Sequence, residues 1–207
     1  MTLAHRSLGL IAAMAFFSGL AGQACAETII SKSVSYFTIR GTTAEELDHE
    51  LNRRGPLTKT SGLRHPGATR IKFGGAVTYF EKGGRCRVQE ARITLSTQII
   101  LPQWKNRKKA KPGLAMIWET LSADIKRHEE RHAEIARNHA RDMERKLLRL
   151  GPERSCEALQ ARVAAVSKAA IDTHDRDQAR FDRIEAANFE DRMMRLLRHR
   201  MKAKTLN

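Results

Sequence analysis

Two kinds of hydrophobic pattern follow one another along this chain. Between about residue 28 and residue 104, apolar and polar residues alternate with a period of two, which is typical of half-buried β-strands. The longest alternating run covers 91–99, and shorter runs cover 34–38 and 71–73. This part of the chain is therefore predicted to form a small antiparallel sheet.

One short helix interrupts these strands. Thr43 and Glu46 have the spacing of a capping box, and Leu47 and Leu51 lie four residues apart on one helical face. The Gly-Pro pair at 55–56 stops the helix. The sequence thus predicts one short helix between the first and second strands.

After a basic linker at 105–111, the hydrophobic period becomes helical. Apolar residues and histidines recur at steps of three or four between residues 114 and 143, and again between residues 159 and 184. A Gly-Pro pair at 151–152 separates the two segments, and Ser155 is a good N-cap for the second. Two amphipathic helices with a short connection pack as an antiparallel hairpin. The chain is thus expected to be an α+β protein, with a small antiparallel sheet and one short helix packed on a long helical hairpin.

The first 26 residues have the pattern of a cleavable signal peptide. Arg6 precedes an apolar run at 8–20, and Ala-Cys-Ala at 24–26 precedes Glu27. The run is shorter than the roughly 20 residues that cross a bilayer. Lipid attachment at Cys25 is the alternative, but Gly22 stands where a lipobox needs Leu or a similar residue. We expect a secreted or periplasmic protein that starts near Glu27 and has no transmembrane segment.

The expected mature chain has a strand-rich part, 27–104, and a helical part, 105–207, which ends in a basic tail; we expect the two to form one domain. The full chain carries 38 Lys and Arg against 23 Asp and Glu, a formal charge of +15. Such a charge favours anionic partners, here an anionic envelope surface. Two Tyr and two Trp are too few for base-stacking platforms, so no nucleic acid is expected.

Two cysteines remain after export, Cys86 and Cys156. In an oxidising compartment such a pair is most simply a disulfide, which would close a loop of about 70 residues. Neither has a second cysteine two to four residues away, so zinc ligation by them is not expected.

The clearest chemical motif is HExxH, formed by His128, Glu129 and His132. Residues four apart share a helical face, so both imidazoles can bind one Zn²⁺ while Glu129 acts on the attacking water. His139 lies on the same face but about 10 Å along the axis from His132, too far for the same ion. A structural or second-site role suits His139 better.

The third zinc ligand depends on the register of the predicted hairpin. A turn centred near residue 153 places residues 128–132 opposite His174, which is therefore the expected third ligand. Asp177, one turn on, could accept a ring N–H of a ligating histidine or bind zinc itself. Glu185 faces inward too, but would lie about 15 Å out of register unless the second helix is shifted.

The order of several motifs resembles a bacterial family of uncharacterised domains regarded as predicted secreted zinc-dependent proteases. The motifs are Tyr-x-x-x-x-Gly at 36–41, a helix closed by Gly-Pro, a cysteine-containing strand, Leu-Pro-Gln-Trp at 101–104 and HExxH. The resemblance covers nearly the whole mature chain. It implies that His128 and His132 bind zinc and that Glu129 is catalytic.

Members of that family end with Tyr-Asp-x-x-Thr-x-His-Gly. Residues 181–188 of this chain read Phe-Asp-Arg-Ile-Glu-Ala-Ala-Asn, without the Thr and the His. If the family's His is a ligand, Ala187 cannot replace it, so His174 or Glu185 substitutes or the site is weakened.

The sequence thus predicts an exported zinc metallopeptidase that hydrolyses peptide bonds in a peptide or protein substrate. The alternative is a non-catalytic, basic envelope-binding module whose HExxH is structural or decayed. Zinc with a water-accessible open position would favour the enzyme, whereas a closed four-ligand site or no metal would favour the module.

Overall fold

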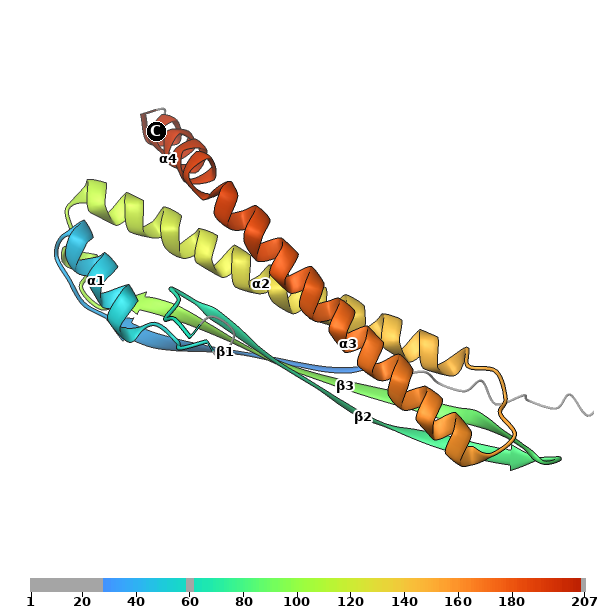
Figure 1. The fold of residues 1–207 in the computed structure, drawn as a ribbon. Helices are drawn as coiled ribbons and strands as arrows, with labels where there is room; N and C mark the ends of the chain where they lie inside the picture. Colours follow the sequence, from blue (N-terminus) through green and yellow to red (C-terminus); the bar gives the residue numbers. More distant parts are fainter. Residues whose placement is uncertain (1–27, 59–61, 206–207) are drawn as a thin grey trace, which may run out of the picture.

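The computed structural model describes residues 28–58 and 62–205 (Figure 1). The expected signal peptide and the start at Glu27 lie outside the described residues. The described part is α+β, as predicted. Its elements are β1 (Ile29–Ile39), α1 (Ala44–Arg54), β2 (Ala68–Lys82), β3 (Arg85–Trp104), the 3₁₀ turn η1 (Arg107–Lys109), α2 (Pro112–Leu148), α3 (Cys156–Ala187) and α4 (Phe189–Thr205).

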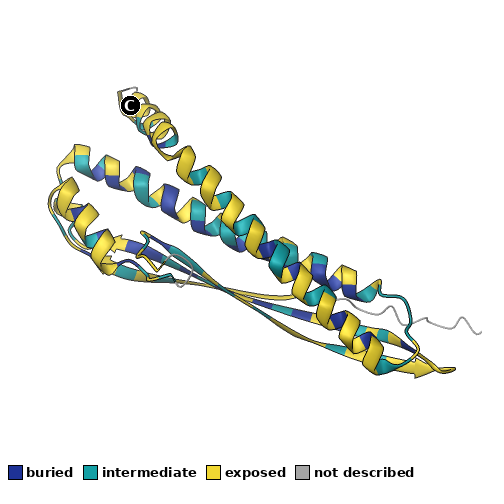
Figure 2. Cartoon of the chain, viewed as in Figure 1, coloured by how far each residue is buried: buried dark blue, intermediate teal, exposed yellow. Residues whose placement is uncertain are grey.

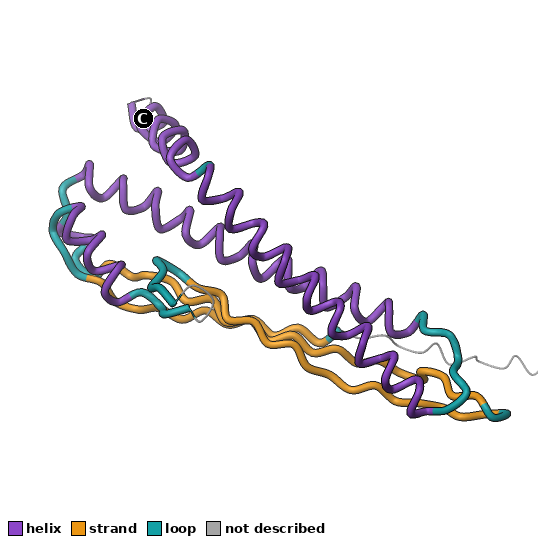
Figure 3. The backbone as a smooth tube through the Cα atoms, viewed as in Figure 1, coloured by secondary structure: helices purple, strands orange, loops and turns teal. Residues whose placement is uncertain are grey.

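The sheet has three strands in the order β1-β3-β2. The strands β2 and β3 form an antiparallel hairpin, but β1 runs parallel to β3, so the sheet is mixed and the expectation of a purely antiparallel sheet was wrong. Parallel neighbours need a long connection, and the segment between β1 and β3 contains both α1 and β2. Figure 3 shows the strands as one long twisted ribbon along the helices.

The short helix α1 forms where the capping pattern predicted it. The hydroxyl of Thr43 accepts a hydrogen bond of 3.2 Å from the backbone N–H of Glu46. Leu47 and Leu51 are buried in a small core with two tryptophans, one from the end of β3 and one from α2. This contact places the start of α2 at one end of the sheet.

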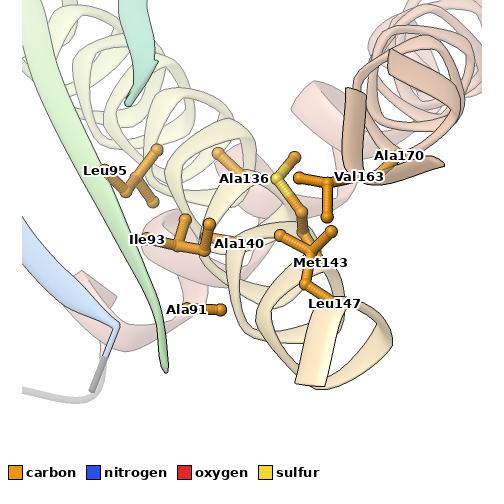
Figure 4. Close-up of a cluster of buried hydrophobic side chains, with 9 residues drawn as sticks. All are labelled: Ala91, Ile93, Leu95, Ala136, Ala140, Met143, Leu147, Val163 and Ala170. Atoms are coloured by element: carbon orange, nitrogen blue, oxygen red, sulfur yellow. The ribbon is translucent and has the colours of Figure 1, made fainter. Parts of the chain in front are cut away.

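The long helices cover one face of the sheet, with α2 over β3 (Figure 1). Alanines on α2 let its backbone approach the strand closely, and Figure 2 shows buried positions along this side of α2. Figure 4 shows the largest core cluster, to which β3, α2 and α3 all contribute. Its members are Ala91, Ile93, Leu95, Ala136, Ala140, Met143, Leu147, Val163 and Ala170.

The start of α3 is fixed on the β2–β3 hairpin. Cys86 and Cys156 form the expected disulfide. Beside it, the backbones of Cys86 and Glu153 exchange two hydrogen bonds of 2.9 Å. The helix α3 therefore begins at the sheet, crosses α2 and rises away from the strands (Figure 1).

The predicted basic tail is a helix, α4, that continues α3 after a break at Asn188. Ion pairs of 2.9 and 3.1 Å between Arg192 and Asp124 hold it on the first half of α2, and its Met193 is buried. Within residues 28–58 and 62–205, no helix combines the length and the apolar character needed to cross a membrane.

Candidate metal centre

Three side chains that can bind a metal meet between α2 and α3. His128 and His132 lie one turn apart on α2, and their Nε2 atoms are 3.0 Å apart. The Oδ1 atom of Asp182, on α3, is 3.3 Å from Nε2 of His128 and 2.9 Å from Nε2 of His132. One donor atom from each residue lies within 4.8 Å of the other two.

This donor set fits zinc. Zinc bonds of about 2.1 Å place the ligand atoms of a tetrahedral site about 3.4 Å apart, close to the distances between these three donors. Two lone-pair-bearing ring nitrogens 3.0 Å apart repel each other unless a proton or a cation lies between them. Two nitrogens and one oxygen also leave the fourth position of a tetrahedral ion open, as in catalytic zinc sites.

Phe181 and Glu185 complete the surroundings of His128. The Phe181 ring stacks on His128, with ring centroids 4.9 Å apart, and meets His132 edge-on. The Oε2 atom of Glu185 is 3.7 Å from Nδ1 of His128. The aromatic ring thus shields one side of the histidine pair from water.

Glu129 lies on the side of α2 that faces the start of β2. It is 5% exposed, and the Thr69 hydroxyl lies 2.8 Å from its Oε2 atom. The backbone of Gly67 passes so close that a Cβ there would lie 2.9 Å from Oε1 of Glu129. Burial raises the pKa of the Glu129 carboxyl, although the Thr69 hydrogen bond and the charges of both motif histidines oppose this effect. A carboxyl with a raised pKa is suited to accepting and releasing a proton.

Asp182 and His132 shift each other's pKa in opposite directions. Burial alone would raise the pKa of Asp182, but hydrogen bonds with His128 and His132 outweigh burial and hold this pKa far below its usual range. Burial likewise would lower the pKa of His132, but Asp182 and Gln178 outweigh it and raise the pKa. The aspartate is therefore anionic at neutral pH, which is the form that binds a cation.

The other residues considered from sequence lie around this group. His174 falls outside it, and its Nε2 atom is 2.8 Å from Nε2 of Gln178. Asp177 pairs with His139 at 2.9 Å, so His139 has a structural partner away from the three donors.

The difference in the third donor comes from the hairpin register. Gln178 lies opposite His132, where the sequence placed His174. The contacts between α2 and α3 thus lie farther along α3 than a turn centred near residue 153 predicts: by four residues at His132, and by seven at His128, whose neighbour is Glu185. Asp182 was not named among the candidate ligands from the sequence, although it occupies the position of the aspartate in the Tyr-Asp-x-x-Thr-x-His-Gly pattern.

A pocket of about 610 Å³ lies beside the site, between the edge strand β1 and α2. Phe181 and Glu185 form part of its wall, but none of the three metal donors does. Two ion pairs of 2.7 Å, Lys32–Glu130 and Arg131–Glu134, lie among its lining residues. The pocket therefore adjoins Phe181, which stacks on His128, but the donor residues do not line it.

Comparison with known proteins gives one match. No curated protein and no solved structure is significantly similar to the chain. Residues 34–189, about three quarters of the chain, match a family described as bacterial protein of unknown function (DUF922). The match extends from β1 to the first residue of α4 and so includes HExxH and Asp182. The chain therefore belongs to the bacterial protein family of unknown function DUF922.

Proposed function

We propose that the protein is an exported zinc metallopeptidase in which His128, His132 and Asp182 hold the metal and Glu129 is the general base. One observation carries this proposal: two imidazole nitrogens and a carboxylate oxygen converge within 4.8 Å beside a buried glutamate on the same helix. This combination supplies both a three-ligand zinc site and a proton acceptor.

Zinc in this position supplies Lewis acidity, which makes water a nucleophile at neutral pH and polarises a peptide carbonyl. The protein's own residues do the rest. Asp182 balances part of the metal charge, and Phe181 excludes water from one side of the two imidazoles.

Glu129 moves the proton. Its carboxylate accepts the proton of the attacking water and passes it to the leaving amine. The water therefore does not attack as a neutral molecule, and the amine does not leave as an anion. The Thr69 hydroxyl and the close backbone of Gly67 hold the carboxylate in one place. A fixed base of this kind contributes typically about 10²- to 10⁴-fold to the rate.

Metal analysis of the purified mature protein tests the zinc site. We expect about one zinc per chain. Asp182→Ala should weaken zinc binding by more than about 100-fold, because the loss of a metal ligand weakens binding more than the loss of a residue that only hydrogen-bonds to a ligand. Asp172→Ala is the matched control, since Asp172 is an aspartate on the same helix whose side chain is 45% exposed and pairs with Lys168. Absence of zinc from the folded wild type, or full zinc in Asp182→Ala, would contradict this ligand set.

Hydrolysis of an unfolded protein such as casein tests the activity. The zinc-loaded wild type should cleave casein, and a chelator should stop it. Zinc-loaded protein that leaves casein and a mixed peptide library intact would contradict the peptidase assignment.

A second candidate function, binding to an anionic envelope surface, is favoured by α4. This helix carries six Lys and Arg against two acidic residues, and its apolar residues Met194 and Met201 are about half exposed. Basic helices with exposed apolar residues bind anionic lipid surfaces. Co-sedimentation with vesicles that contain phosphatidylglycerol, but not with vesicles of pure phosphatidylcholine, would support this function. Binding to neither kind of vesicle, or equal binding to both, would contradict it.

A further inference from the structure

We infer that Gln178 is the positioning residue that fixes the ring of His132, so that Nε2 and not Nδ1 faces the metal. This inference rests on the proposed metal site and adds a residue that neither the motif nor the family pattern contains. It also gives a role to His174, which the sequence placed at the metal itself.

The amide of Gln178 holds His132 at two points. Its Oε1 atom is hydrogen-bonded to Nδ1 of the His132 ring. Its Nε2 atom donates to the backbone carbonyl of His132 across 3.1 Å. One side chain on α3 thus binds both the ring and the backbone of a residue on α2.

These two contacts determine where the protons are. A backbone carbonyl only accepts, so the amide nitrogen of Gln178 must face it and the amide oxygen must face the ring. An amide oxygen also only accepts, so Nδ1 of His132 must carry a proton. Nε2 donates to Oδ1 of Asp182, 2.9 Å away, only when the ring is doubly protonated; in the neutral ring Nε2 carries the lone pair, and it also lies 3.0 Å from Nε2 of His128. The nitrogen left free to bind a metal is therefore the one at the donor group.

His174 keeps the amide in this orientation. The second N–H of the Gln178 amide points to Nε2 of His174, 2.8 Å away, and Nδ1 of His174 is 2.9 Å from the carboxylate of Asp175. Donation from Nδ1 to Asp175 leaves Nε2 of His174 as an acceptor. His174 is 4% exposed, and burial lowers its pKa, which keeps the ring neutral. The ring of Phe73 packs edge-on against it at 4.9 Å.

Three variants of the full mature chain test the inference by zinc affinity, measured by competition with a chelator of known affinity. Gln178→Leu removes the acceptor for Nδ1 and should weaken zinc binding about 10- to 100-fold, as expected for a partner of a metal-bound histidine. Gln178→Glu keeps an oxygen that accepts from Nδ1 and should bind zinc at least as well as the wild type. Gln160→Leu is the matched control, because Gln160 is exposed on the same helix about 27 Å away.

A second measurement does not depend on any variant. Long-range ¹H–¹⁵N correlation spectra of the zinc-loaded wild type, with labelled histidine, should show His132 protonated at Nδ1 and metal-bound at Nε2. Coordination of His132 through Nδ1 would overturn the inference, and so would wild-type affinity in a folded Gln178→Leu protein. If Gln178→Leu does not fold by circular dichroism, the spectra decide.

The outcomes separate the inference from the proposed function. Zinc binding that depends on Gln178 without peptide hydrolysis would leave the inference standing and refute the peptidase. Zinc binding and hydrolysis that are both insensitive to Gln178 would refute the inference alone. A folded wild type that binds no zinc would refute both.

Discussion

Glu129 lies next to the metal donors without belonging to them, so its replacement should separate catalysis from metal binding. Glu129→Gln keeps the size of the side chain and the contact with Thr69 but removes the proton acceptor. We expect unchanged zinc content and a loss of casein hydrolysis of about 10²- to 10⁴-fold. Zinc content and initial rates of hydrolysis measure the two effects.

The neighbouring Glu130 provides the control. It is not one of the metal donors and pairs with Lys32 at the surface. Glu130→Gln should leave both zinc content and hydrolysis close to wild type. Equal rates in the two variants would refute the role of Glu129 as the base.

Gly67 tests how tightly Glu129 is held. A Cβ at position 67 would lie 2.7 Å from Cγ2 of Ile125 and 2.9 Å from Oε1 of Glu129. Gly67→Ala must therefore displace one of them, and we expect it to lower the free energy of unfolding by about 1–3 kcal/mol and to slow hydrolysis. Chemical denaturation measures the first effect. Gly151→Ala, where a Cβ would meet nothing within 4 Å, should stay within about 0.5 kcal/mol of wild type.

Among single residues, the sequence predicted those side chains that lie close together because of their spacing along one helix. His128 and His132 meet because four residues make about one helical turn, so no knowledge of the rest of the fold was needed. Asp182 and Gln178 meet the histidines only through the packing of two helices. A change of one turn in register exchanges one set of partners for another, and local pattern does not determine register.

Among the elements, α4 is held on α2 in part by an ion pair with a buried aspartate. Asp124 on α2 is 5% exposed and accepts hydrogen bonds from Arg192 of α4 and from Arg127. Arg192→Ala leaves a buried carboxylate with one cation instead of two, so we expect a loss of about 2 kcal/mol in the free energy of unfolding. Arg195→Ala, at an exposed position on the same helix, should cost less than about 0.5 kcal/mol. Urea denaturation compares the two, and equal losses would contradict the role of Arg192.

The same contact should make stability depend on pH. Burial would raise the pKa of Asp124, but hydrogen bonds from Arg192 and Arg127 outweigh burial and hold it below its usual value of 3.8. The folded state thus binds this proton less tightly than the unfolded state, so the contribution is present above 3.8 and is lost as the pH falls through the folded pKa.

The expected result is a steeper fall in the free energy of unfolding for wild type than for Asp124→Asn between about pH 5 and pH 3. Urea titrations at several pH values measure the two slopes. Parallel curves would show that Asp124 does not contribute.

The helices were more predictable than the arrangement of the strands. The caps at Thr43 and Ser155 mark helix starts through contacts within four residues, and both are present. The parallel pairing of β1 with β3 brings Ile29 opposite Thr94, which are far apart in sequence. Alternation shows that a segment is a strand but carries no information on the direction of its neighbour. The basic tail was not predicted to be a helix, although its apolar residues Met193, Leu196 and Leu197 recur at helical spacing.

For the whole molecule, the disulfide should be a main source of stability. Cys86 and Cys156 are separated by 70 residues, and a cross-link of that span stabilises by about 4 kcal/mol because it restricts the unfolded chain. The double variant Cys86→Ala/Cys156→Ala should therefore unfold at a markedly lower urea concentration. Reduced wild type should behave like the variant, and an unchanged midpoint in both would contradict this expectation.

The same bond makes a covalent ring of residues 86–156, which includes all of β3 except its first residue and all of α2. The three HExxH residues lie inside the ring, and the helix that carries Asp182 begins at its closing residue, Cys156. A cut of one peptide bond anywhere between the two cysteines therefore leaves one covalent molecule with all its metal donors attached. Under the proposed function, a nick made by another peptidase or by a second copy of the protein would thus leave all the proposed metal donors on one covalent molecule, whereas the same nick would separate an unlinked chain into two pieces.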